Sequence, residues 1–408
     1  MTQVISRRLT LVAVLLVALA TQLVSSCKSM VDAGSSQSAV KYQFITALGA
    51  PRGRSNPGVN WTGAQLIVWG GQSKTITGDG SRGGVWSSQR KAWRTVTSAD
   101  APHNRYQHSS VWTGDNLIIW GGISVSGGET YLADGGIYNP EYDSWDDSLR
   151  AEIIKGRAGH SAVWTGAEMI VWGGFDDTQE FADGAIYNPK TRKWRALPTE
   201  NAPSARSSHL AGWTGSKMII FGGKNDNKEI ANGGIYDTET GKWSKMARPG
   251  QLIEATSGMS TSWVDDHLVV WGGEVDGMPV GTGAVWNPET NEWSEMASSG
   301  APSPRSLHLA VSTGKQLIVF GGRNDIAYTD GAVYSPADNK WMDRFKIRNR
   351  DIVATQRGQT AVWADGKMII WGIDKNADLE SEMTASTSSK PKSGTDSILA
   401  IYLSNKVE

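Results

Sequence analysis

The chain has 408 residues, enough for two or three ordinary domains, but a repeat of fixed period overrides a count made by length. Its 47 glycines, 19 tryptophans and 20% charged residues favour many short strands joined by tight turns over helices. The formal net charge of −1 gives no overall field that would gather nucleic acid or an anionic membrane, so we expect no nucleic-acid partner.

The first 27 residues differ in character from the rest of the chain. Arg7 and Arg8 precede an apolar run over residues 9–20, which is the pattern of a secretory signal peptide. This run is too short for a comfortable membrane helix. Residues 24–27, VSSC, resemble the lipobox of bacterial lipoproteins, in which the cysteine is lipidated. The alternative is an ordinary signal peptide cut nearby, with Cys27 incidental.

Cys27 is the only cysteine, so we expect neither disulfides nor a cysteine-based metal site in the mature protein. Residues 28–40 are rich in Ser, Gly and Ala and predict a flexible tether. We therefore expect a protein that is lipid-anchored in the bacterial cell envelope, at the outer membrane or facing the periplasm. It would contact the membrane through its anchor only.

The stretch over residues 160–174, HSAVWTGAEMIVWGG, recurs seven times without insertion or deletion. Each copy has two aromatic positions eight residues apart, with Ser in the first position of copy six. In chain order, copies one to seven carry Trp61 and Trp69, Trp112 and Trp120, Trp164 and Trp172, Trp213 and Phe221, Trp263 and Trp271, Ser312 and Phe320, and Trp363 and Trp371.

Each copy predicts four short strands. In copy three, an alternating segment over residues 161–164 leads through Thr165 and Gly166 into an apolar run over residues 169–172, which is a hairpin. The second strand is apolar on both faces, as expected for a sheet packed between two other sheets. A third strand over residues 184–187 ends on an aromatic residue, and a fourth opens on a Trp seven residues later.

The copies predict a closed ring. The third strand of copy seven, residues 400–402, is followed by too little chain for a fourth strand. Tyr42 precedes Trp61 by 19 residues, which is the interval between Trp93 and Trp112. We therefore predict an all-β fold over residues 41–408, a propeller of seven blades with four antiparallel strands each. The N-terminal strand near residues 41–48 would complete the last blade.

The Gly-Gly pair, the aromatic residue in strand three and the Trp in strand four resemble the kelch repeat over essentially all of residues 41–408. The fuller pattern, R-x-x-H-x-x-x-W-T-G-x-x-M-I-V-W-G-G, is similar to the kelch-type repeats of secreted and cell-envelope bacterial proteins. The resemblance implies a β-propeller. Kelch propellers include protein-binding modules and a few enzymes, so the fold alone does not give the activity.

The connections between strands two and three vary in length, whereas the hairpin turns are constant, so we place binding on the face that carries the variable loops. Two polar columns approach this face. Seven residues before the first aromatic position stand Arg54, Arg105, Arg157, Arg206, Thr256, Arg305 and Gln356. Four residues before it stand Pro57, His108, His160, His209, Met259, His308 and Gln359.

Two interpretations of these columns remain open. Aspartates three residues after the glycine pair are the expected ion-pair partners of the arginines, namely Asp177, Asp226, Asp276 and Asp325. Alternatively, some of the arginines and histidines bind an anion or a carbohydrate. Departures in copies five and seven break the symmetry. Glu254, Thr256 and Met259 make one side of the mouth less basic, and this is the side on which we expect a pocket.

The leading hypothesis is a binding or scaffold propeller that recognises a protein or glycan through the variable face, as a monomer without cofactor or metal. The alternative is a periplasmic sugar-modifying enzyme, similar to the sialic-acid epimerases that share the kelch fold. Galactose oxidase, another kelch enzyme, requires a Tyr cross-linked to Cys, and Cys27 cannot supply it. The polar insertion over residues 374–395 predicts a mobile flap on the variable face.

Overall fold

The computed structural model describes residues 38–39, 41–45, 48–51, 56–72, 83–124, 128–253, 257–347, 359–373 and 397–402. The chain divides into two compact units, Met1–Ser38 and Ala39–Glu408, and the repeats lie in the second. Within the described ranges, no helix is long and apolar enough to cross a membrane. The predicted signal peptide, Cys27, the tether up to residue 37 and the flap over residues 374–395 lie outside the described residues.

Copy three shows the predicted strand pattern. Its antiparallel strands follow one another in the order β13 (Ser161–Trp164), β14 (Met169–Trp172), β15 (Gly184–Asn188) and β16 (Lys193–Ala196). The hairpin register pairs Trp164 with Met169, and the outer register pairs Tyr187 with Trp194. The hairpin and the Trp-led fourth strand predicted from the sequence are confirmed.

The other copies repeat this pattern. Copies one and two form β3 (Gly58–Trp61), β4 (Gln65–Trp69), β5 (Gly84–Ser87), β6 (Ala92–Thr95), β8 (Ser109–Trp112), β9 (Leu117–Trp120), β11 (Asp134–Asn139) and β12 (Ser144–Arg150). Copies four and five form β17 (Leu210–Trp213), β18 (Lys217–Phe221), β21 (Gly233–Asp237), β22 (Lys242–Lys245), β23 (Ser260–Val264), β24 (His267–Trp271), β27 (Gly283–Asn287) and β28 (Glu292–Glu295). Copies six and seven form β29 (Leu309–Ser312), β30 (Leu317–Phe320), β31 (Asp330–Ser335), β32 (Lys340–Lys346), β33 (Thr360–Ala364), β34 (Lys367–Ile373) and β35 (Ser397–Tyr402).

The number of four-stranded blades differs from the prediction. The described residues form six four-stranded sheets, where seven were predicted, and one sheet of five strands. The five-stranded sheet is that of copy six, in the order β1-β32-β31-β30-β29, with β1 (Ser38–Ala39) at its outer edge. The prediction failed here because β1 is only two residues long and lies outside the repeat pattern.

The N-terminal and C-terminal strands of the propeller pair with each other. β2 (Lys41–Ile45) is antiparallel to β35, with Tyr42 opposite Ile401, in a sheet ordered β2-β35-β34-β33. A strand from the beginning of the unit thus completes the sheet of copy seven, as the spacing of Tyr42 predicts. This pairing leaves no sheet edge of copy seven open at β35.

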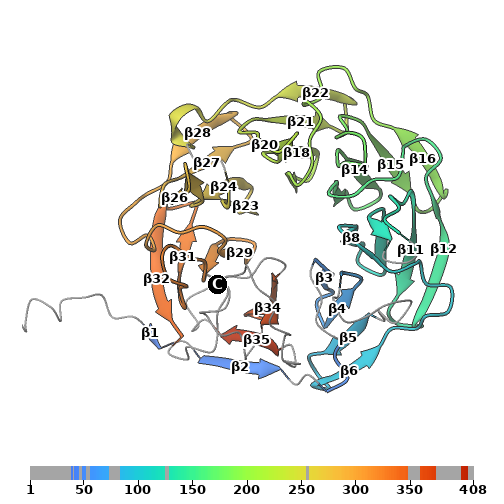
Figure 1. Cartoon of the computed structure of the whole chain (residues 1–408), viewed down its shortest axis with the longest axis horizontal. Helices are drawn as coiled ribbons and strands as arrows, with labels where there is room; N and C mark the ends of the chain where they lie inside the picture. Colours follow the sequence, from blue (N-terminus) through green and yellow to red (C-terminus); the bar gives the residue numbers. More distant parts are fainter. Residues whose placement is uncertain are drawn as a thin grey trace, which may run out of the picture. The chain divides into compact units, whose positions relative to one another are not determined.

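The sheets stand around a common axis (Figure 1). The first strand of each copy contacts the first strand of the next, in the closed order β3, β8, β13, β17, β23, β29, β33 and back to β3. The second strands are buried on both faces, and all four residues of β14 are fully buried. Side chains from adjacent sheets form shared cores, such as the one in which Trp172 of copy three packs with Met218 of copy four.

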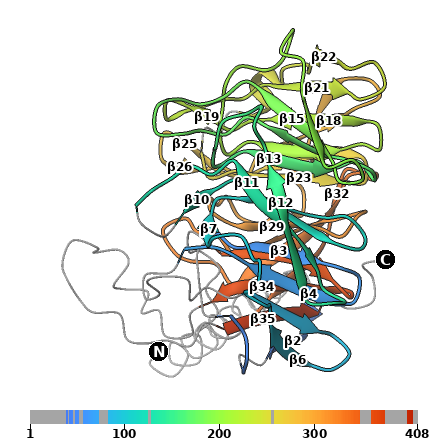
Figure 2. The same ribbon diagram turned by 90° about the vertical axis from the view of Figure 1, so that its right-hand side faces the viewer.

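Short two-residue strands mark the variable loops. They are β7 (Arg105–Tyr106), β10 (Ile123–Ser124), β19 (Lys224–Asn225), β20 (Lys228–Glu229), β25 (Glu274–Val275) and β26 (Met278–Pro279), and a 3-10 helix covers Gly250–Leu252. Figure 2 shows β10, β19, β25 and β26 on one face of the propeller. This is the variable face, since both the connection between strands two and three and the connection between copies emerge there.

Candidate functional site

The four arginines at Arg105, Arg157, Arg206 and Arg305 have no exposed surface. Arg157 shows the shared geometry: its Nε donates to the carbonyl of Lys155 at 3.0 Å, and its Nη1 donates to the carbonyl of Gly173 at 3.0 Å. The same Nη1 lies 2.7 Å from the carboxylate of Asp183. Each guanidinium therefore joins the start of its copy to the glycine pair and to the entrance of the third strand.

The ion-pair partners of these arginines are not the predicted aspartates. The observed partners lie four residues before the strand-three aromatic, namely Asp134, Asp183, Asn232 and Asp330. The predicted partners Asp177, Asp226, Asp276 and Asp325 are exposed at loop tips. The glycine pair was the wrong reference point because the loop behind it varies in length. Counting back from the third-strand aromatic would have found the true partners.

Aromatic rings cover two of the guanidinium groups. Arg157 lies 4.1 Å from the ring centre of Phe181, and Arg305 lies 4.1 Å from that of Tyr328. Such stacking favours Arg over Lys, because the planar guanidinium is weakly hydrated and matches the ring face. The arrangement leaves these arginines no open face for a ligand.

The histidine column lies between neighbouring sheets. Each ring packs edge-on against the second-strand Trp of the preceding copy, with centroid distances between 4.9 and 5.4 Å in the pairs Trp69–His108, Trp120–His160, Trp172–His209 and Trp271–His308. Three rings also reach a serine of that preceding copy through Nε2. His160 bonds Ser109 at 3.0 Å, His209 bonds Ser161 at 2.8 Å and His308 bonds Ser260 at 2.8 Å. His108 lacks this bond because the equivalent position is Gly58.

This environment keeps the rings neutral. Burial, and after it the charge of the arginine three residues earlier, lowers the pKa of three of them to about 3, namely His108, His209 and His308. The pKa of His160 is also well below its ordinary value, first through burial and then through the charge of Arg157. His108 and His209 are partly exposed as residues, but their Nδ1 atoms are buried. The histidine rings are thus uncharged and pack between the sheets of neighbouring copies.

The histidine column is interrupted at copies one, five and seven, where Pro57, Met259 and Gln359 take the position. At copy five the aromatic residue that would contact the histidine also differs, since copy four has Phe221 in place of Trp. A pocket of about 300 Å³ opens at this place on the variable face. Its lining includes Phe221, Met259 and Leu210, together with Lys224 and Glu229. Glu254 and Thr256, expected on the same side, lie outside the described residues.

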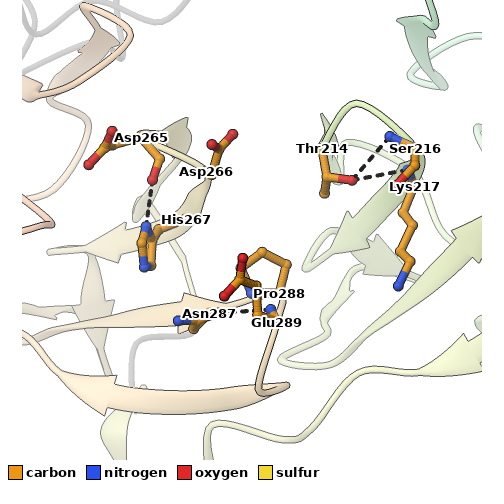
Figure 3. A pocket seen from close by; sticks show the side chains of 9 residues that line it. All are labelled: Thr214, Ser216, Lys217, Asp265, Asp266, His267, Asn287, Pro288 and Glu289. Atoms are coloured by element: carbon orange, nitrogen blue, oxygen red, sulfur yellow. Dashed lines mark hydrogen bonds between the residues drawn. The ribbon is translucent and has the colours of Figure 1, made fainter.

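A second pocket, of about 450 Å³, lies between the same two copies on the face of the hairpin turns. Figure 3 shows Asp265, Asp266 and Glu289 on one side of it and Lys217 on the other. Nδ1 of His267 lies 2.5 Å from the carbonyl of Asp265, so this ring is held by its own turn. The pocket is lined by turn residues and by three residues at strand ends, Lys217, His267 and Asn287.

Comparison with known families assigns the repeat. The family profile described as the KLHDC2/KLHL20/DRC7 Kelch-repeats domain matches residues 56–212 and again residues 159–372. The chain belongs to the kelch-repeat family. The two matches overlap over residues 159–212. No curated protein matches the chain.

The kelch scaffold therefore accounts for most of the predicted site residues. The columns at Arg105, Arg157, Arg206 and Arg305 and at His108, His160, His209 and His308 stand in separate copies, and each member is engaged within its own copy or with the one before. Among the described residues, no three His, Cys, Asp or Glu side chains gather in a way that could hold a metal ion. The columns are not brought together into one centre.

Proposed function

We propose that this kelch propeller is a binding scaffold that recognises a protein partner through its variable face. The observation that carries the proposal is a pair of exposed apolar side chains on adjacent loops of that face. Met278, in the loop of copy five, is 69% exposed, and Ile326, in the loop of copy six, is 67% exposed. Apolar side chains on variable loops, held by a rigid scaffold, favour a protein surface as the ligand.

The packing of the polar columns supports binding over catalysis. A general acid or base must reach a substrate atom, and its pKa should lie near the working pH. The four column histidines have buried Nδ1 atoms and pKa values far below neutrality. The four column arginines have no exposed surface. These residues do not supply the converging groups that a sugar-modifying enzyme requires.

The proposal includes the site of action. We propose that lipidation of Cys27 anchors the protein in the bacterial cell envelope, with the propeller acting as a monomer beside the membrane. A Cys27→Ala variant should then move from the membrane fraction to the soluble fraction. An unchanged distribution would contradict the anchor without affecting the binding scaffold.

Paired surface variants test the binding face. Met278→Asp combined with Ile326→Asp should abolish co-purification of the native envelope partner, because both changes place a charge within the proposed contact. Tyr142→Asp is the matched control. Tyr142 is 73% exposed but lies in the turn between β11 and β12, on the opposite face. Two outcomes would contradict the proposal. The partner could be lost only from the Tyr142→Asp control, or the ligand lost from the double variant could be a glycan and not a protein.

A further inference from the structure

The pocket between copies four and five exists because a histidine is missing. At four other junctions this space is filled: a Cβ added at Gly70, Gly121, Gly173 or Gly272 would meet Cε1 of the next histidine at 2.4 to 2.8 Å. At Gly222 the nearest atom to such a Cβ is the carbonyl oxygen of Ile230, at 3.7 Å. Met259 in place of His therefore leaves room at the junction of copies four and five.

Part of the pocket lining suits an apolar side chain. Leu210 and Met259 supply partly exposed apolar side chains beside the polar Ser208, Ser257 and Thr261, whereas Phe221 is fully buried. The thioether of Met is flexible and adapts its shape to an incoming group. The volume of the pocket, about 300 Å³, is at the lower end of the range for ligand pockets, which is roughly 300–1,000 Å³. The space suits one residue of a partner better than a large metabolite.

The charged residues that line the pocket are one base and one acid, whereas the loops around it carry an excess of acids. Lys224 and Glu229 face each other across β19 and β20, and burial raises the pKa of Glu229 while the charge of Lys224 opposes the rise. The variable loops of copies three, four and five carry only two basic residues, Lys224 and Lys228. Beside Asp183, which pairs with Arg157, their carboxylates are Asp176, Asp177, Glu180, Asp226, Glu229, Glu274 and Asp276. This excess of negative charge favours a basic segment.

We propose that this pocket receives one medium-sized apolar side chain, Leu or Met, from a basic segment of a partner protein. The inference rests on the proposed function and deepens it by naming the anchor and its flanking charge. A segment is favoured over a free small molecule because carboxylates of the surrounding loops, such as Asp226 and Asp276, lie outside the pocket lining and would meet residues on either side of the anchor. An apolar anchor in a pocket surrounded by charge-complementary contacts is the usual form of a binding hot spot.

Methyl NMR on the purified protein, with methionine methyl groups labelled, tests the pocket directly. The probe is the capped peptide Gly-Lys-Leu-Lys-Gly, compared with versions in which Ala replaces Leu or Glu replaces both lysines. The Leu peptide should shift the Met259 methyl signal, which a Met259→Leu variant assigns. It should also bind at least about tenfold more tightly than either of the other two peptides.

Two variants locate the interaction. Met259→His introduces the residue of copies two, three, four and six and fills the space beside Gly222, so it should weaken binding of the Leu peptide by at least about tenfold. Met259→Leu keeps the pocket apolar and should change the affinity by less than about threefold. Glu229→Lys reverses a charge on the exposed rim, so its loss of affinity is measurable even where Met259→His fails to fold.

Several outcomes would overturn this inference. They are an unmoved Met259 signal, equal binding of the Ala peptide, unchanged binding to Glu229→Lys, or binding of free leucine as tight as that of the peptide. The proposed function has its own readout. A native partner that still binds Met259→His but not the Met278→Asp, Ile326→Asp variant overturns the pocket and leaves the scaffold intact. A native partner indifferent to both variants contradicts the scaffold as well.

Discussion

The buried arginines and histidines are the residues that the sequence marks most strongly as chemical, and the structure gives them architectural roles. Arg157 joins three backbone segments of its own copy through the carbonyls of Lys155 and Gly173 and the entrance of β15. His160 fills the junction with the preceding copy. Because the same contacts recur, a substitution in any of these copies should act on stability before it acts on binding.

Removal of one buried guanidinium should be costly. Arg157→Met would leave the carbonyls of Lys155 and Gly173 without their donors, and a buried unsatisfied polar group costs about 1–3 kcal/mol. We expect a loss of at least about 2 kcal/mol in the free energy of unfolding, measured by urea denaturation.

Arg192→Met is the matched control for this measurement. Arg192 also pairs with a carboxylate, that of Asp146 at 2.5 Å, but the two side chains are 61% and 36% exposed. Exposed pairs contribute about 0–1 kcal/mol. Equal losses in the two variants would show that burial of Arg157 does not control its contribution.

The histidine column should make stability depend on pH. Below about pH 6.5 the unfolded chain binds protons at these histidines, whereas the folded rings, with pKa values of about 3, do not. Acid therefore favours the unfolded state, and stability falls as pH drops from about 6.5 towards 3. At pH values well below the pKa of the unfolded chain, each histidine lowers the free energy of unfolding by about 1.4 kcal/mol for each pH unit of acidification.

Urea unfolding at about pH 7.5 and about pH 5.5 measures this effect while most carboxylates stay ionised. His209→Gln removes one of the titrating groups, so the difference between the two pH values should shrink relative to the unaltered protein. A difference that stays the same in the variant would mean that His209 is protonated in the folded state.

At the scale of the element, the glycine pair after each second strand sets how closely neighbouring copies approach. The first glycine adopts a positive φ, +67° at Gly173 and +71° at Gly222, where any side chain is strained. The two differ in their surroundings, because Gly173 faces a histidine of the next copy and Gly222 faces the pocket. Substitutions at the two glycines therefore share the cost of backbone strain and differ in the cost of packing.

The two glycines form a matched pair for substitution. In Gly173→Ala the new Cβ would lie 2.6 Å from Cε1 of His209 and 2.9 Å from the carbonyl of Arg206. In Gly222→Ala it would meet only the carbonyl of Ile230 at 3.7 Å. Backbone strain at a positive φ should cost about 1 kcal/mol of stability in both variants. Overpacking should cost a further 1–3 kcal/mol, roughly, at Gly173 alone. Thermal unfolding of both variants compares them, and equal shifts would refute the packing account.

The strands were predictable from the sequence because their signals are local. The Trp residues recur at fixed intervals, and Thr165 and Gly166 mark the turn, so β13 and β14 follow from the order of side chains alone. The partner of Arg157 was not predictable from the glycine pair, because the loop between Gly174 and Asp183 has no fixed length. Its position relative to Tyr187 is fixed, since both belong to the same strand entrance.

Variation between copies contained a signal that sequence reasoning used only in part. Phe221 and Met259 change together, as do Phe320 and Gln359, and both pairs occupy the positions of a Trp–His contact. In copy five, Thr256 replaces the arginine and Thr282 stands where its acidic partner would be. Paired changes of this kind indicate contact. The presence of a pocket could be inferred from them, but its lining required the structure.

At the scale of the whole molecule, the propeller depends on pairing between β2 and β35. In the sequence these strands are separated by nearly the full length of the unit. Their register is nevertheless continuous from Lys41 opposite Tyr402 to Ile45 opposite Ile398. The sequence indicated this pairing through the missing fourth strand of copy seven. It did not indicate the fifth strand of copy six, since β1 carries no repeat signal.

Loss of β2 should open the ring. A variant that lacks Lys41–Ile45 would expose the edge of β35, and we expect its melting temperature to fall by many degrees, measured by circular dichroism. A synthetic peptide of residues 38–48 added in excess should recover part of the loss by restoring the strand. A melting curve unaffected by the deletion would contradict closure by β2.

The central claim is that the histidine column belongs to the architecture, and we propose binding at one of its interruptions, Met259. The most direct measurement is an NMR titration of the histidine side-chain nitrogens in the folded protein. The rings of His108, His160, His209 and His308 should remain neutral from about pH 7.5 to about pH 4.5, since burial holds their pKa values far below this range. Protonation of any of the four near pH 6.5 would show a ring open to solvent and to ligands, and would contradict the account.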